Sequence, residues 1–377
     1  MTERAESPRW IELAGSDDPR DVVHRAVACL AQGGVVGLST ETVYGLTACA
    51  LSPEGVARVR EMRVSDPDRP LTLLLRGPEE VADWAPGIST LGRRMAARLW
   101  PGPATLVFSS GFEGGLAERL PDAARALISP TGDLAVRSPS QSIVRDVLRL
   151  LPAPLVITMA ATEKHPVPGT AESLRELTGL DMVVDAGPTR YQRPATIVRI
   201  DGDRYRLERE GVVEAPDLAL CASLIMIFVC TGNTCRSPMA EALCKAILAR
   251  RLGCPIDQLE DRGYVIRSAG VAAASGSPAA AHAVEIVRRR GGVLDTHRSR
   301  RMLPALAHQA DYIFSMTAEH HRLLIEQVPS AESRAYLLDP DGGDVDDPYG
   351  ADLETYDRTA QMIEAMLERR LDQIGLV

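Results

Sequence analysis

Residues 224–241 read LIMIFVCTGNTCRSPMAE, and this stretch decides the fold of the C-terminal part of the chain. Its first seven residues form a continuous β-prone run, which is typical of a buried central strand in a parallel sheet. A short loop containing Gly232 follows, and Pro238 opens a segment whose apolar residues recur at helical spacing. A strand, a glycine-containing loop and a helix in this order form the phosphate-binding arrangement of doubly wound α/β folds.

The loop contains the spacing Cys-x5-Arg, from Cys230 to Arg236. Backbone N–H groups of a loop that leads into a helix can surround a tetrahedral oxyanion and also stabilise a thiolate. We therefore predict that Cys230 is a nucleophile and that Arg236 grips phosphate oxygens and the charge of the transition state. We expect Gly232 to adopt a backbone angle that other residues resist. Asn233 and Ser237 are expected to hold the loop and to hydrogen-bond the sulfur. The other candidate phosphate-binding residues are Thr231, Thr234 and Cys235.

A second Cys-x5-Arg spacing, from Cys244 to Arg250, lies inside the predicted helix. That segment contains no glycine and cannot curl around an anion, so we interpret Cys244 as a structural residue. A phosphocysteine mechanism also needs a general acid. The segment DVDDPYG (344–350) contains Asp347, which precedes a proline and lies close to Tyr349. An acidic Asp-Pro turn is usually a solvated loop, but beside the cysteine loop Asp347 becomes the candidate acid and Tyr349 a candidate substrate contact.

Several stretches resemble the low-molecular-weight protein-tyrosine-phosphatase family over the whole C-terminal part: CTGNTCRSPMAEAL, RSAGV (267–271), HRSR (297–300), ADYIFSM (310–316) and DPYG (347–350). The resemblance implies a flavodoxin-like parallel-sheet fold, a phosphorylated protein as substrate, and no metal or cofactor. It also implies the roles that the chemistry gives to Cys230, Arg236 and Asp347.

Two positions in the loop leave alternatives open. Family members that act on phosphotyrosine usually carry a larger aliphatic residue where this chain has Thr234, whereas the protein-arginine-phosphatase branch carries Thr. The string from Cys230 to Glu241 resembles that branch, so we favour phosphoarginine over phosphotyrosine. Cys235 is either a small packing residue or the partner of Cys230 in a reversible protective disulfide.

The N-terminal part alternates short apolar strands with helical patterns, which indicates a second α/β domain. We expect an extension at 1–17, a first domain at 18–213, a linker at 214–223 and the phosphatase-like domain at 224–377. Four stretches of the first domain resemble the YrdC-like threonylcarbamoyl-AMP synthase family: GLSTETVYGL (37–46), WPGPAT (100–105), AVRSP (135–139) and the tail from ATIV (195–198) to EREG (208–211).

That resemblance implies a concave twisted-sheet α/β domain with a positively charged cleft. Enzymes of the family join threonine, bicarbonate and ATP to make an intermediate for tRNA t6A modification. The cleft residues that this chain shares with the family are Thr40, Thr42, Tyr44, Arg63, Arg137, Thr196 and Arg209.

Other nucleotide-handling positions of the family are substituted. Polar or basic family residues are replaced at Glu61, Arg69, Leu74, Met159, Ala161 and Ala195. At ~1–3 kcal/mol per charged contact, these losses should weaken triphosphate binding by several kcal/mol, with Arg69 compensating in part. We interpret the first domain as inactive or retuned, and ATP is expected as its ligand only if it is active. The alternatives are an active synthase, a sensor that binds a nucleotide, threonine or RNA, and a structural partner of the phosphatase.

Composition limits the remaining function classes. The chain has 377 residues, 45% hydrophobic and 25% charged, with a formal net charge of −9, which is ordinary for about two globular domains. The acidic balance, without a dense basic run, argues against strong nonspecific nucleic-acid binding. No apolar run near a motif approaches the ~20 residues of a membrane span, and MTERAESPRW lacks a signal-peptide core. We expect a cytoplasmic protein with reduced cysteines and no membrane partner.

Overall fold

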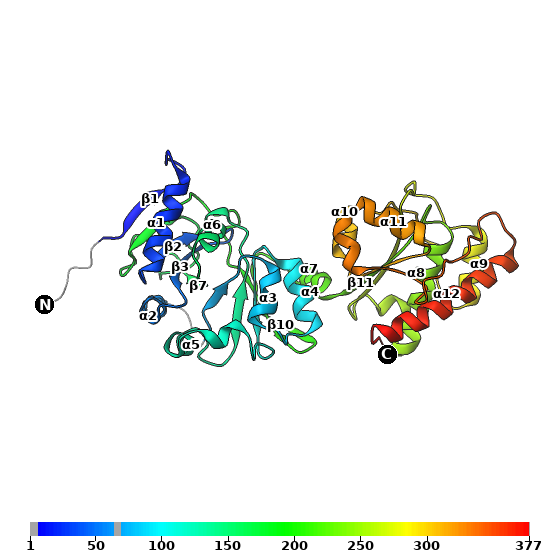
Figure 1. Cartoon of the computed structure of the whole chain (residues 1–377), viewed down its shortest axis with the longest axis horizontal. Coiled ribbons are helices and arrows are strands. Elements are labelled where there is room, and N and C mark those ends of the chain that lie inside the picture. The colour runs from blue at the N-terminus through cyan, green and yellow to red at the C-terminus, as the bar shows by residue number, and fades with distance from the viewer. Residues whose placement is uncertain (1–6, 64–68, 377) are drawn as a thin grey trace. The chain divides into compact units, whose positions relative to one another are not determined.

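The computed structural model describes residues 7–63 and 69–376 (Figure 1). The chain divides into two compact units, Met1–Cys221 and Ala222–Val377. Each unit contains its own sheet with helices, and this confirms the predicted α/β class. The segment 214–223, which we expected to be a linker, is mostly helical because it contains α7 (Ala215–Ala222).

In the described part of the first unit, the sheet has ten strands in the order β1-β8-β2-β3-β7-β4-β6-β5-β9-β10. The sheet is mixed, since β2 pairs antiparallel with β3 while β4 pairs parallel with β6. The strands are β1 (Arg9–Glu12), β2 (Val36–Ser39), β3 (Tyr44–Cys49), β4 (Thr72–Leu74), β5 (Ala104–Phe108), β6 (Leu134–Arg137), β7 (Leu155–Met159), β8 (Met182–Asp185), β9 (Thr196–Asp201) and β10 (Arg204–Arg209).

The helices of this unit begin where the sequence supplies caps. Asp18 accepts a hydrogen bond from the Arg20 N–H at the start of α1, and Ser52 accepts one from the Gly55 N–H at the start of α2. In both helices a proline occupies the first turn, where its missing N–H costs nothing. The helices are α1 (Pro19–Ala31), α2 (Pro53–Glu61), α3 (Val81–Trp84), α4 (Thr90–Leu99), α5 (Asp122–Ile128), α6 (Ser142–Leu150) and α7, with 3₁₀ turns at Pro78–Glu80, Leu116–Arg119 and Ala171–Leu174.

The second unit has a parallel sheet in the order β12-β11-β13-β14 among the residues described, as the flavodoxin-like prediction requires. The chain leaves β11 toward β12 on one side and later returns to β13 on the other side. The end of β11 is therefore a topological switch point, where α/β sheets bind ligands. The elements are β11 (Leu224–Cys230), β12 (Tyr264–Gly270), β13 (Tyr312–Ser315), β14 (Ala335–Leu337), α8 (Arg236–Leu252), α9 (Ala281–Arg289), α10 (Pro304–Gln309), α11 (Ala318–Gln327) and α12 (Leu353–Gln373), with 3₁₀ turns at Ile256–Gln258 and Pro329–Arg334.

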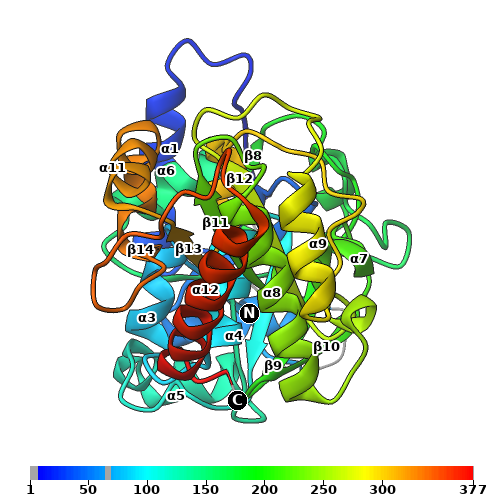
Figure 2. The same cartoon turned by 90° about the vertical axis from the view of Figure 1, so that its right-hand side faces the viewer.

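Both faces of this sheet are buried, which explains the unbroken apolar run of β11. Met226 and Phe228 pack in a core with residues of α8, α9 and α12, helices that lie alongside one another (Figure 2). Ile225, Ile227 and Val229 point to the opposite face and pack with residues of α10 and α11.

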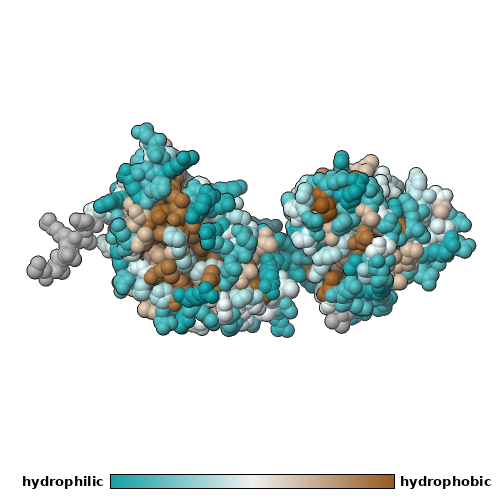
Figure 3. Space-filling model, in the orientation of Figure 1, coloured by the Kyte–Doolittle hydropathy of each residue, from teal (hydrophilic) through white to brown (hydrophobic). Residues whose placement is uncertain are grey.

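The visible surface of each unit is mostly hydrophilic, and smaller hydrophobic areas interrupt it within each unit (Figure 3). None of the helices in residues 7–63 and 69–376 combines the length and apolarity that a membrane crossing needs.

Candidate active site

The cysteine loop lies at the carboxyl end of the central strand of the second unit. Cys230 ends β11 with 3% of its surface exposed, and α8 begins at Arg236. The chain reverses at Asn233, whose φ of 55° lies in the left-handed region that asparagine tolerates better than most residues. Our expectation for Gly232 was wrong, because its φ lies outside that region. The special backbone angle of the loop belongs to the buried Asn233.

Polar groups of the loop converge on the Cys230 sulfur. The Asn233 N–H donates to Sγ at 3.3 Å, and the Ser237 Oγ lies 3.0 Å from it. The Asn233 amide Nδ2 donates to Ser237 and also to Ser268 of β12. The Ser268 hydroxyl donates to the carboxylate of Glu241 at 2.7 Å. This buried network sets the loop before any ligand binds, and it places the Asn233 N–H and the Ser237 hydroxyl against the Cys230 sulfur.

The outer side of the loop is fixed by the segment that follows β12. The N–H groups of Val271 and Ala272 donate to the carbonyls of Cys230 and Thr231. A side chain at Gly270 would place its Cβ 2.3 Å from the Thr231 carbonyl oxygen, so this glycine permits the close approach of the two segments. The RSAGV motif is explained by these contacts.

Residues 280–300 supply further contacts to the same side. The Ala280 N–H donates to the Thr234 carbonyl, and His297 Nε2 donates to the Asn233 carbonyl at 2.8 Å. The Arg300 N–H donates to the Asn233 side-chain oxygen. The HRSR motif (297–300) thus meets the loop at Asn233, a contact that nothing in its spacing along the chain could indicate.

Arg236 and Asp347 meet across the mouth of the loop. Arg236 is 7% exposed, and its Nη1 donates to the Val345 carbonyl. Its Nη2 forms an ion pair with Asp347 Oδ2 at 2.7 Å, while Asp347 Oδ1 accepts from the Tyr349 N–H. Tyr349 itself is 79% exposed beside this pair. The predicted clamp, acid and neighbouring tyrosine are thus brought together from distant parts of the chain.

Cys235 contacts a residue of the last helix. Its thiol is free and lies 3.2 Å from the hydroxyl of Tyr356 in α12. Burial and the contact with Cys235 raise the pKa of Tyr356 above its ordinary value. Thr234 is half-buried, and its hydroxyl lies 3.7 Å from the Cys235 sulfur. Tyr356 is a neighbour of the loop that lies 121 positions away along the chain, so no local pattern could indicate it.

Cys244 has none of these surroundings. It is fully buried in α8, and burial raises the pKa of its thiol to about 12. At neutral pH it is therefore a protonated thiol in the hydrophobic core, as expected of a structural cysteine.

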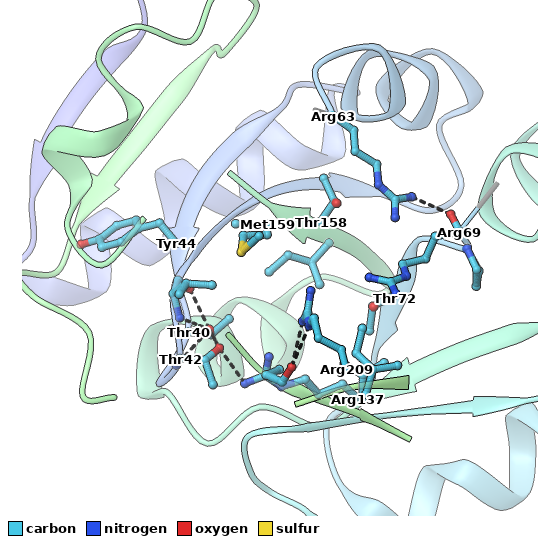
Figure 4. Close-up of a pocket in the computed structure, with 17 residues that line it drawn as sticks. Thr40, Thr42, Tyr44, Arg63, Arg69, Thr72, Arg137, Thr158, Met159 and Arg209 are labelled. Atoms are coloured by element: carbon cyan, nitrogen blue, oxygen red, sulfur yellow. Dashed lines mark hydrogen bonds between the residues drawn. The ribbon is translucent and has the colours of Figure 1, made fainter. Parts of the chain in front are cut away.

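The first unit has a separate pocket that contains most of its predicted cleft residues (Figure 4). Six of these line it: Thr40, Thr42, Tyr44, Arg63, Arg137 and Arg209. Thr196 does not, because its buried hydroxyl donates to the Val213 carbonyl and accepts from the Val213 N–H. The Tyr44 hydroxyl likewise points away and donates to the Gly187 carbonyl, and burial raises the pKa of Tyr44 to about 12.

Four guanidinium groups gather around this pocket, since Arg69 lines it together with Arg63, Arg137 and Arg209. Arg137 forms a buried ion pair with Glu41, in which the Nη2 and Oε1 atoms lie 2.6 Å apart. The hydrogen bonds of Arg209 among the described residues go from Nε and Nη2 to the backbone carbonyl of Ala195. Burial first, and then the other three arginines, lower the pKa of Arg209 to about 10. No carboxylate lines the pocket in the described part of the chain, so the charged groups of its lining are all positive.

The substituted family positions divide into two groups. Arg69, Met159 and Ala195 line the pocket, so these three changes alter its wall directly. Leu74 is buried in the hydrophobic core, and Glu61 and Ala161 are not among the lining residues.

A parallel sheet, a cysteine loop at its switch point and an arginine at the start of the following helix define a cysteine-dependent phosphatase. The family model described as low molecular weight phosphotyrosine protein phosphatase matches residues 225–375. A protein-arginine-phosphatase of Bacillus subtilis is 36% identical over 153 residues, 40% of this chain and 95% of the relative. The chain therefore belongs to this phosphatase family through its second unit. The YwlE arginine phosphatase structure from Geobacillus stearothermophilus matches with 32% identity, covering 40% of this chain and 92% of that one at a TM-score of 0.35.

The first unit is matched at residues 28–211 by the Sua5/YciO/YrdC family model, described as telomere recombination. A putative threonylcarbamoyl-AMP synthase of Methanocaldococcus jannaschii is 28% identical over 191 residues, 50% of this chain and 85% of the relative. The chain is thus a fusion of a YrdC-like domain with a low-molecular-weight phosphatase domain.

Proposed function

We propose that this chain is a protein phosphatase that removes phosphate from arginine side chains through a phosphocysteine intermediate. The observation that carries the proposal is the Cys230 sulfur, held by the Asn233 N–H and the Ser237 hydroxyl at the start of α8. The thiolate attacks phosphorus and the P–N bond breaks. Asp347, as the acid, gives its proton to the departing guanidine. Arg236 holds the equatorial oxygens.

The second step regenerates the enzyme. Water attacks the phosphocysteine, Asp347 takes its proton, and the S–P bond breaks to release inorganic phosphate and the thiolate. Arg236 must turn from Asp347 to the phosphoryl oxygens when substrate enters, because the same Nη2 cannot serve both anions fully. The ion pair therefore keeps both groups at the mouth of the loop until substrate separates them.

Thr234 supports arginine as the side chain that carries the phosphate. The N–H donors of a guanidinium can be accepted by a hydroxyl in the loop wall, whereas a phenyl ring gains more from an aliphatic wall. Curated relatives of the second unit include proteins named protein-arginine-phosphatase. Others are named as probable low-molecular-weight protein-tyrosine-phosphatases.

The test compares phosphoarginine and phosphotyrosine forms of one peptide with the full chain. We expect higher kcat/KM for phosphoarginine, and Thr234→Ile should shift the ratio toward phosphotyrosine by about tenfold or more, because one pocket contact is worth roughly 10–200-fold. Thr234→Ser, which keeps the hydroxyl, is the matched control. Preference for phosphotyrosine in the wild type, unchanged by Ile, would support the tyrosine phosphatase instead.

The arginine cluster favours a second function, in the first unit. We propose that its pocket binds a nucleotide through the phosphate groups, with Arg63, Arg69 and Arg209 as the contacts. Calorimetry with ATP checks this, with Arg209→Gln as the test variant. Arg204→Gln, an exposed arginine of β10 outside the pocket, is the control. Equal ATP binding by all three proteins would contradict the assignment, and retention of RNA instead would favour an RNA ligand.

A further inference from the structure

His320 links helix α11 to the residue that follows the nucleophile. Its Nε2 lies 2.8 Å from the Thr231 hydroxyl, and its Nδ1 lies 2.9 Å from the hydroxyl of Thr317. Thr317 caps α11 and accepts a hydrogen bond from the backbone N–H of His320. The imidazole is 4% exposed, whereas Thr231 lies at the surface. A buried ring bonded at both nitrogens thus holds an exposed side chain of the phosphate loop.

The hydrogen bond from His320 comes from a different segment than the other hydrogen bonds that hold the loop. The bonds to residues 230–234 described above come from Ser237 of α8, from β12 and from residues 271–300. His320 instead follows β13, which pairs with the opposite side of β11. Among the described residues that follow β13 directly, His320 is the one whose side chain hydrogen-bonds to loop residues 231–235. Thr231 is therefore held between two neighbours of the central strand.

The ring is neutral at ordinary pH. Burial and the nearby Arg236 lower the pKa of His320 to about 4, against the opposing effects of Asp347, Asp344 and Glu319. A neutral imidazole has one donor and one acceptor nitrogen, so each contact to a threonine hydroxyl has a fixed direction. The link adds orientation to the loop without adding charge beside the arginine.

We propose that His320 is a positioning residue of the phosphatase: through Thr231 it fixes the first turn of the phosphate loop against the phosphoryl group. The inference rests on the phosphatase function proposed above. The loop N–H groups stabilise charge that grows in the transition state, and a misplacement of 1 Å in such a site can cost about 100-fold in rate. Loss of the link should therefore reduce kcat more than it raises KM.

The experiment uses the full chain with four variants. His320→Ala removes the link, and His320→Gln keeps an amide that can reach Thr231. Thr231→Val removes the other partner with little change in volume. His321→Ala is the matched control, because it deletes the neighbouring imidazole of α11, whose Nδ1 has no hydrogen-bond partner in the described part. Circular dichroism and thermal unfolding establish that each variant is folded.

We expect His320→Ala to lower kcat/KM by about 10-fold to 100-fold, chiefly in kcat. His320→Gln should recover most of this loss, and His321→Ala should stay within about twofold of wild type. The double variant His320→Ala/Thr231→Val should be no slower than the worse single variant, since both changes break one link. A folded His320→Ala within twofold of wild type, or fully multiplied losses in the double variant, would overturn the proposal.

A second readout separates this inference from the phosphatase proposal. Iodoacetate alkylates Cys230 without turnover, and inorganic phosphate in the loop should protect it. Protection should need severalfold more phosphate in His320→Ala than in wild type or His321→Ala. If wild type is protected but hydrolyses no phosphorylated substrate, the function proposal fails while the inference stands. Equal protection of all variants overturns the inference whatever the enzyme hydrolyses.

Discussion

Cys230, the proposed nucleophile, differs from Cys244 in the polar groups that surround its sulfur. The sulfur is buried, and burial alone would favour the neutral thiol, as it does at Cys244. At Cys230 the Asn233 N–H and the start of α8 supply partial positive charge that Cys244 lacks, and the Ser237 hydroxyl contacts the sulfur. Two buried cysteines of one domain therefore have different surroundings.

The first prediction uses this contrast. Cys230→Ser should abolish turnover while the fold survives, because an alcohol in the same loop is a far weaker nucleophile than a thiolate. Cys244→Ser should keep activity within about threefold, apart from some loss of thermal stability, since it places a hydroxyl in an apolar core. Steady-state kinetics and thermal unfolding of both variants are the measurements. Full activity in Cys230→Ser, or none in a folded Cys244→Ser, would show that the nucleophile is misassigned.

The second prediction concerns the ion pair between Asp347 and Arg236. Asp347→Asn removes a negative group that competes with phosphate for the guanidinium, so inorganic phosphate should inhibit the variant at lower concentrations than wild type. The same change removes the acid, so hydrolysis should slow most for substrates with poor leaving groups.

Competitive inhibition by phosphate, and rates with p-nitrophenyl phosphate and an alkyl phosphate, check both halves. Asp346→Asn, the exposed neighbour with no recorded partner among the described residues, is the control. Equal slowing of the two substrates would falsify the role of Asp347 as general acid.

At the scale of elements, α11 makes the stability of the second unit depend on pH. His320 has a folded pKa of about 4, below the 6.5 of an unfolded histidine. As pH falls below 6.5, the unfolded chain binds a proton that the folded chain does not bind. The contribution of this ring is therefore complete above pH 6.5 and decreases as pH falls toward 4.

The third prediction follows from that sign. Between pH 7 and 5 the second unit should lose more stability in wild type than in His320→Gln, which has no titrating ring. Labelling of buried Cys244 in urea measures this, since all three tryptophans (Trp10, Trp84 and Trp100) lie in the first unit and report its unfolding instead. Parallel pH slopes in the two proteins would contradict the prediction, and the tryptophan transition serves as the internal control.

At the scale of the whole molecule, the two units carry two different candidate anion sites. The loop of the second unit is built from consecutive residues, whereas the pocket of the first unit draws its arginines from the segment 62–63 after α2, from β6 and β10, and from the segment before β4. Met159 and Ala195 line that pocket. They stand at positions where the YrdC-like synthase family, which the first unit resembles, carries polar residues.

The fourth prediction is that the full chain forms little or no threonylcarbamoyl-AMP. The measurement is the release of pyrophosphate from ATP in the presence of threonine and bicarbonate. A reaction mixture without threonine gives the background. The physical reason is the lost polar contacts at the pocket wall, each worth ~1–3 kcal/mol when charged. Complementation of a strain without the synthase would contradict it and would establish a bifunctional enzyme.

The sequence by itself determined the phosphate loop and the class of fold. Strand, loop and helix are contiguous from Leu224 to Leu252, so a local pattern reports the whole arrangement. For the same reason the predicted helix that begins near Pro238 agrees with the structure, where α8 spans Arg236–Leu252. The short strands β10 and β14 lie at sheet edges and pair with one neighbour each, so that pairing defines them more than their own residues do.

Tertiary structure alone decided which distant side chains meet. Arg236 and Asp347 lie 111 positions apart, and His320 reaches Thr231 across 89 positions. Thr196 looked like a cleft residue, but its hydroxyl is used to hold the backbone at Val213. The left-handed turn fell on Asn233 rather than Gly232, because the Asn233 side chain finds partners on β12, α8 and at Arg300. Spacing along a chain fixes which residues share a loop or a helix face, but contacts between segments depend on how the sheet brings their ends together.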